Sequence, residues 1–169
     1  MRRRSRRGAT MVEFVLAGIP MLFAWISIVE MARGMWYYHT LQYSVKRAAS
    51  YLTVHGATCA MAPNSCTIQI KDVAAVLRST AIGISDSNMN VTFTSQSGTS
   101  VSCAPLSNCS ANTTQWPPTT NGDNQVGKFV QIRADIMFHS ALSMWVPGQG
   151  GVQFGVFDFP GFAQEMIRF

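Results

Sequence analysis

The sharpest contrast between polar and apolar positions falls within the first thirty residues. Five arginines precede Gly8, and residues 9–29 then carry a single charge, that of Glu13. As a helix, residues 9–29 would be about 32 Å long, which matches a bilayer core of about 30 Å. The pattern therefore predicts a membrane-spanning helix at 9–29.

The arginines predict the orientation of this helix. Short Arg-rich segments stay on the cytoplasmic side of a membrane, so residues 1–8 are expected to form a cytoplasmic leader and the chain beyond about residue 35 to be extracytoplasmic. A cleaved secretory signal is the alternative. The run ends in Ile28, Val29 and Glu30, without a clear small-x-small cleavage site, so we favour a retained single-pass anchor.

A second pattern begins where the apolar run ends. Apolar residues recur every three or four positions through residues 30–56, which predicts an amphipathic continuation of the same helix, from about residue 9 to 55, with Gly56 as its stop. We expect this stripe to pack against the protein's own sheet, and a groove for a partner is the alternative. The stripe consists of Met31, Met35, Tyr38, Leu41, Val45, Ala48 and Leu52.

Residues 57–169 are predicted to form a small α+β head. A helix is expected at 72–81, ended by Gly83, and strands at 90–94, 128–139, 152–159 and 162–169, with Pro160 and Gly161 as a break between the last two. The polar segment 95–125 is expected to be an exposed loop, with Trp116 on the domain surface rather than at a contact site. The predicted core face of strand 128–139 comprises Val130, Ile132, Ala134, Ile136 and Phe138.

The head is rich in aromatic residues near its C-terminus. Core packing is the expected role of these side chains, although so small a sheet cannot easily bury all of them, and some could face lipid headgroups or a partner. They are Trp145, Phe154, Phe157, Phe159 and Phe162.

All four cysteines follow the apolar run. We favour the local disulfides Cys59–Cys66 and Cys103–Cys109, which an oxidising exterior would allow. Four cysteines permit three pairings, and a zinc site is the rival interpretation. Six and five residues intervene within these pairs, compared with the two to four that are typical of structural zinc sites.

Charge and motif content narrow the function. The formal net charge is +5, from 13 basic and 8 acidic residues, and five of the basic residues precede Gly8. The remaining chain is balanced, which argues against nucleic-acid binding, since that needs a basic face. No catalytic or phosphate-binding motif is present. We therefore predict neither an enzyme nor a protein with a cofactor, a metal or a small-molecule substrate.

Glu13 is costly beside an apolar run unless it is paired. If the chain were cut after Gly8, Ala9 would carry a new amine and Glu13 would be the fifth residue, one helical turn away. Glu13 could then neutralise that amine or the amine of a neighbouring subunit. The alternative is that Glu13 lies at the membrane boundary and reaches into the headgroups.

The sequence Arg6-Arg7-Gly8-Ala9-x-x-Val12-Glu13-Phe14, followed by an apolar helix with Pro20, resembles the TadE-like proteins. These are minor pseudopilins of Tad (Flp-type, type IVb) pilus systems. Further matches are a Glu-x-x-Arg block at Glu30 and Arg33, Leu41-Gln42, and Arg47-Ala48-Ala49. The strong resemblance covers about residues 6–55.

The resemblance implies a pilin-like fold, in which a long N-terminal membrane helix continues into an amphipathic helix packed on a small antiparallel sheet. It implies cleavage by a prepilin peptidase between Gly8 and Ala9, with Glu13 and Phe14 serving recognition and assembly. The expected location is the bacterial inner membrane or the pilus, with other pilus assembly subunits as partners. A signal-anchored envelope protein unrelated to pili is the alternative.

Overall fold

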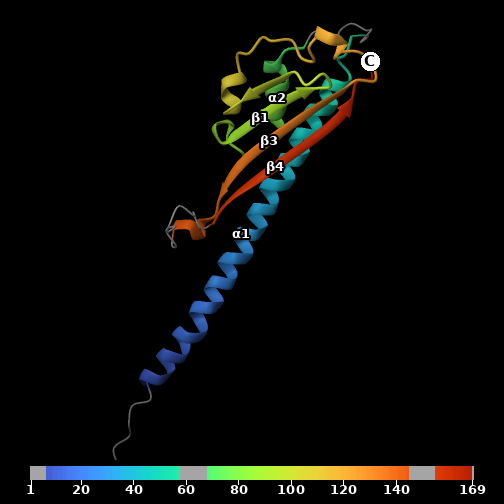
Figure 1. The fold of residues 1–169 in the computed structure, drawn as a ribbon. Helices are drawn as coiled ribbons and strands as arrows, with labels where there is room; N and C mark the ends of the chain where they lie inside the picture. The colour runs from blue at the N-terminus through green and yellow to red at the C-terminus, as the bar shows by residue number, and fades with distance from the viewer. Residues whose placement is uncertain (1–6, 58–67, 145–154, 169) are drawn as a thin grey trace, which may run out of the picture. The chain divides into compact units, whose positions relative to one another are not determined.

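A computed structural model describes residues 7–57, 68–144 and 155–168 of the chain (Figure 1). The chain divides into two compact units, Met1–Met35 and Trp36–Phe169. The fold is α+β and pilin-like: a long N-terminal helix, a second helix and a four-stranded antiparallel sheet. The fold class predicted from the sequence is confirmed.

The first helix, α1, spans Arg7–Thr53 and agrees closely with the predicted 9–55. Within the second unit its apolar stripe is buried from Leu41 onward, as expected of a helix that packs on its own sheet. Met31 and Met35 do not continue this buried face, because their side chains are exposed. The fully buried members of the stripe are Leu41, Val45, Ala48 and Leu52.

The sheet has the strand order β2-β1-β3-β4, and all neighbours are antiparallel. Its strands are β1 (Met89–Ser95), β2 (Ser100–Cys103), β3 (Phe129–His139) and β4 (Val156–Met166). Every residue of the predicted core face of β3 is buried, because successive side chains of a strand alternate between its two faces. The alternation read from the sequence is thus confirmed for the central strand.

The predicted break at Pro160 and Gly161 is wrong. These residues lie inside one strand, β4, that pairs with β3 along its whole length. Proline has no backbone N–H to donate. It is tolerated here because β4 is an edge strand, which has no neighbour on its outer side that needs a hydrogen bond. The Pro160 carbonyl accepts a hydrogen bond of 3.0 Å from the Gln42 side chain of α1.

The second helix, α2, spans Ile70–Thr80, close to the predicted 72–81. The Asp72 carboxylate accepts the backbone N–H of Gln69 at 2.9 Å, which caps the helix start. The chain leaves the helix through Gly83, whose φ of +85° is readily adopted only by glycine. The helix buries Ile70, Val73, Ala74 and Leu77.

The expectation of an exposed loop at 95–125 is wrong. This segment contains β2, the short helix η2 (Leu106–Cys109) and the short helix η3 (Thr120–Gly122). Trp116 is only 1% exposed and contacts Phe93, with 6.1 Å between ring centroids. The Trp116 backbone N–H donates to the Ile68 carbonyl at 2.9 Å, so backbone pairing brings this polar segment onto the core.

The expectation of core packing fails for two of the C-terminal aromatic residues. Phe157 and Phe162 are 53% and 52% exposed. Phe159 is partly buried and stacks on Phe138, with 5.5 Å between ring centroids. Trp145 and Phe154 lie outside the described residues.

Candidate functional site

The apolar half of α1 is the first candidate site. Residues 11–29 are exposed at nearly every position, and the large apolar side chains among them are each at least 41% exposed. In the described part of the chain, α1 is the helix that is long and apolar enough to cross a membrane or to serve as a signal anchor. A helix that is apolar on all sides needs an apolar environment, either lipid or other apolar helices.

The predicted processing residues lie at the start of this helix. Gly8 and Ala9 fall in the first turn of α1, which begins at Arg7. Glu13 lies about one turn further along and is exposed, and Phe14 is 76% exposed. The roles predicted for these four residues stay predictions.

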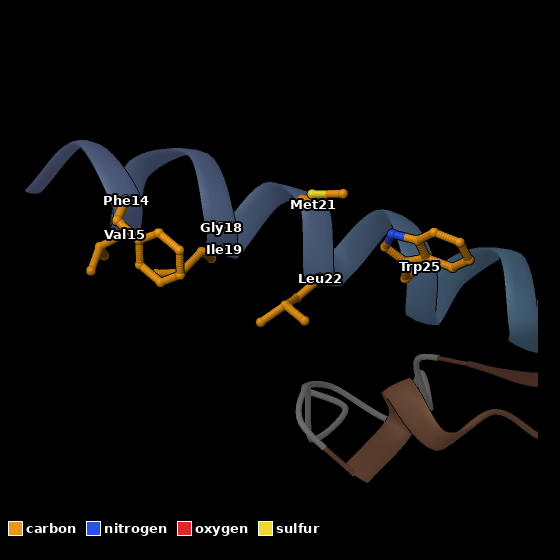
Figure 2. A pocket seen from close by; sticks show the side chains of 7 residues that line it. All are labelled: Phe14, Val15, Gly18, Ile19, Met21, Leu22 and Trp25. Carbon is orange, nitrogen blue, oxygen red and sulfur yellow. The ribbon is translucent and has the colours of Figure 1, made fainter. Parts of the chain in front are cut away.

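A hollow of about 420 Å³ lies on the flank of this apolar segment. It forms because Gly18 has no side chain, while Phe14 and Trp25 project on either side of it (Figure 2). A Cβ placed on Gly18 would lie 4.0 Å from the Phe14 ring. The surface of the hollow is almost entirely apolar, which suits an acyl chain or an apolar side chain. The remaining lining residues are Val15, Ile19, Met21 and Leu22.

An ion pair follows the apolar run. Arg33 Nη1 lies 3.0 Å from Glu30 Oε1, at the i,i+3 spacing that lets side chains meet on a helix. These are the two residues of the Glu-x-x-Arg block identified in the sequence. Pairing neutralises both charges directly after the apolar segment, where isolated charges would be costly beside lipid.

The cysteine prediction is confirmed for one pair. Cys103 and Cys109 form a disulfide, with 5.6 Å between their Cα atoms. Because these two sulfurs are bonded to each other, they are not zinc ligands. None of the described residues gather into a group of three or more potential metal ligands. Cys59 and Cys66 lie outside the described residues.

Sequence reasoning did not identify a buried carboxylate in the head. Asp123 is 2% exposed and accepts a hydrogen bond of 2.6 Å from the Ser95 hydroxyl. It also accepts bonds from the hydroxyl and the backbone N–H of Ser97. Burial works against ionisation, but these hydrogen bonds and the positive charge of Lys128 outweigh it and lower the pKa of Asp123. These hydrogen bonds connect the loop that contains Asp123 to the end of β1. No sequence motif indicates this role.

The fold and the apolar helix together define a class, a pilin-like α+β protein with one N-terminal helix able to span a membrane. Comparison with known families makes this more specific. Residues 8–50 match the model of the TadE-like protein family, so the N-terminal region is similar to that family. Searches of curated proteins and of solved structures gave no match.

Proposed function

We propose that this chain is a minor pseudopilin that contributes to biogenesis of a Tad-type (Flp, type IVb) pilus. In this proposal residues 1–8 are a cytoplasmic leader and residues 9–29 span the inner membrane. Residues 30–56 continue the helix, and residues 57–169 form the extracytoplasmic head. A prepilin peptidase removes the leader after Gly8, and the trimmed chain joins other pilus assembly subunits. In this proposal the protein is a structural subunit and not an enzyme.

The observation that carries this proposal is the overlap of three features on one segment. The family match begins at residue 8, the apolar helix occupies the same stretch, and Gly8 and Glu13 are five residues apart within it. A generic signal anchor needs the apolar helix and its arginines alone. It does not need a glycine before the helix or a carboxylate at its entrance.

The structure adds a physical reason for a glycine at position 8. Gly8 lies in the first turn of α1, where helices fray, and glycine is about 1 kcal/mol less favourable than alanine inside a helix. A peptidase that needs an extended chain could therefore open this turn at little cost. Glycine also leaves the peptide bond to Ala9 without a neighbouring side chain.

The test is to co-express the full chain with a prepilin peptidase and to sequence the N-terminus of the membrane-extracted product. A product that begins at Ala9 supports the proposal. A product that begins at Met1 favours the alternative, a signal-anchored envelope protein unrelated to pili.

Two variants separate the two effects of glycine. Gly8→Leu should block trimming because of its bulk. Gly8→Ala stabilises the helix at least as much as leucine does but adds only a methyl group. If bulk decides, Gly8→Ala is trimmed better than Gly8→Leu, and if helix stability decides, both fail alike. Gly18→Leu, a matched change outside the proposed site, should be trimmed normally. Normal trimming of Gly8→Leu would contradict the proposed site.

A further inference from the structure

Exposed apolar side chains gather at one end of the second unit. They come from the start of that unit on α1, from the turn after α2, and from the ends of β3 and β4 that lie together. Single exposed apolar residues are common, but a group of them from four separate elements indicates a surface that contacts a partner or a membrane. The four residues, which we name the collar, are Trp36, Ile82, Met137 and Phe157, and they are 59%, 68%, 59% and 53% exposed.

Contacts within the second unit bring the elements that carry the collar together. Trp36 Nε1 lies 3.8 Å from the position that a Cβ on Gly83 would occupy, which brings the turn carrying Ile82 beside α1. The ring of Tyr37 meets the ring of Phe138 edge-on, with 5.4 Å between centroids.

The same contacts extend to the sheet. Phe138 pairs with Phe157 across β3 and β4. Met137 precedes Phe138 in sequence and points to the other face of the sheet, so the collar residues lie on both faces of this end of the sheet. The strands β3 and β4 can be followed to this end in Figure 1, where β3 finishes and β4 begins.

Chain connectivity keeps Trp36, the first residue of the collar in sequence, close to the end of the apolar run. Trp36 is seven residues after Val29, so even a fully extended chain keeps it within about 25 Å of the end of that run. This limit holds whatever angle the two units adopt. Through Trp36, the collar therefore includes the point at which the head is tethered to any bilayer that residues 9–29 span.

We infer that the collar rests on the lipid bilayer, inserted among the headgroups on the extracytoplasmic side. This inference rests on the membrane anchoring in the proposed function. Tryptophan and other apolar side chains suit this zone, where rings with an apolar body and a polar edge are enriched at membrane interfaces. Asp158 is exposed and pairs with Met137 across the strands, so the collar is suited to apolar contact rather than to attraction by anionic lipid.

The test measures quenching of tryptophan fluorescence by brominated phosphatidylcholine, with the full chain at one copy per nanodisc. Trp25, Trp36 and Trp145 are replaced by Phe, and buried Trp116 is kept as a folding reference. An indole is then introduced by Phe157→Trp in the collar. The matched control is Met166→Trp, at the opposite end of β4, where Met166 is 64% exposed and nine residues, about 30 Å, away.

If the collar rests on the bilayer, we expect strong quenching and a shift of the emission to shorter wavelength for Phe157→Trp. We expect neither change for Met166→Trp. Equal quenching of the two would mean that the sheet lies flat on the membrane, and quenching of neither would mean that the collar needs a protein partner. Both results would overturn the inference.

A third chain, which retains Trp25 and Trp116 alone, tests the anchor itself. If Trp25 is quenched but the indole at position 157 is not, the anchor stands and the collar inference fails. If Trp25 is not quenched, membrane anchoring and the collar inference fail together.

Discussion

Gly161 on β4 lies directly beneath Leu41 of α1. A Cβ at position 161 would come within 2.8 Å of Leu41 Cγ and within 3.2 Å of Val45 Cγ2. Real Cβ atoms do not approach other atoms so closely, and Leu41 and Val45 are fully buried, so neither can easily move aside. Glycine at 161 therefore sets how closely the helix lies on the sheet.

Gly161→Ala should destabilise the head by about 1–3 kcal/mol, since adding a methyl group to a packed contact forces side chains away from their preferred positions. The measurement is chemical unfolding of the full chain in detergent micelles. A double-mutant cycle with Leu41→Ala tests the cause. The truncated helix residue makes room for the new methyl group, so the double variant should be more stable than the sum of the two losses predicts. Strict additivity would show that Leu41 does not set the limit.

The packing of α1 on the sheet shows which features can be predicted from the sequence and which cannot. The alternation of β3 and the buried positions of α1 were predictable, because a period of two or of three to four follows directly from strand and helix geometry. Pro160 and Gly161 looked like a break because both weaken strands in general. Their local chemistry does not reveal that β4 is an edge strand or that a helix passes over it.

Trp116→Phe should be tolerated far better than Trp116→Ala. The indole is buried against Phe93, and its Nε1 has no hydrogen-bond partner among the described residues. Phenylalanine keeps most of the apolar volume. It also removes a buried N–H donor whose cost of desolvation is not offset by a hydrogen bond. We expect a loss within about 1.5 kcal/mol for phenylalanine and about 3–5 kcal/mol for alanine.

Unfolding of both Trp116 variants in micelles checks this, with Trp36→Phe as an exposed control that should change stability little. Equal losses for the two Trp116 variants would reveal a hydrogen bond from the indole.

The packing of Trp116 also explains why segment 95–125 was misread. Its composition of Ser, Thr, Asn, Gly and Pro is typical of loops, and little in it indicates a core residue. Besides the local disulfide, two sets of long-range contacts order it, namely the Trp116 backbone bond to Ile68 and the Asp123 bonds to Ser95 and Ser97. Such contacts join positions far apart in sequence and leave no periodic pattern.

Asp123→Asn should destabilise the head at neutral pH by about 1–3 kcal/mol, because the amide cannot accept all the bonds that the carboxylate accepts. The pKa of Asp123 is lowered in the folded protein. Its contribution is therefore fully present above the unfolded pKa of about 4 and is lost as the pH falls through the folded pKa. The stability gap between the wild type and Asp123→Asn should be constant near neutrality and shrink below about pH 4.

Unfolding measured across this pH range tests the assignment. Asp158→Asn, which changes an exposed carboxylate, is the control and should show a much smaller gap. A gap for Asp123→Asn that does not change with pH would mean that its ionisation does not stabilise the fold.

Removing the disulfide by Cys103→Ala together with Cys109→Ala should lower the free energy of unfolding by about 2 kcal/mol. The bond closes a short loop, with a sequence separation of 6, so the entropy that it removes from the unfolded chain is modest. Alanine avoids burying a hydroxyl at two positions that are 1% and 3% exposed. An unchanged unfolding midpoint, or alkylation of Cys103 in the unreduced wild type, would contradict a stabilising bond.

The last prediction concerns Glu13 and rests on the proposed removal of residues 1–8. After trimming, the amine of Ala9 would lie one turn from the Glu13 carboxylate, and each charge would lower the cost of placing the other near lipid. Glu13→Ala should therefore still be trimmed but should appear less often in sheared pili, because it leaves the amine unpaired. Glu13→Asp keeps the charge and should assemble better than Glu13→Gln, which keeps only the size and polarity. Immunoblotting of sheared and membrane fractions, with N-terminal sequencing of each, separates trimming from assembly. Normal incorporation of Glu13→Ala would mean that the carboxylate has no partner in the assembled state and that Glu13 merely lies at the membrane boundary.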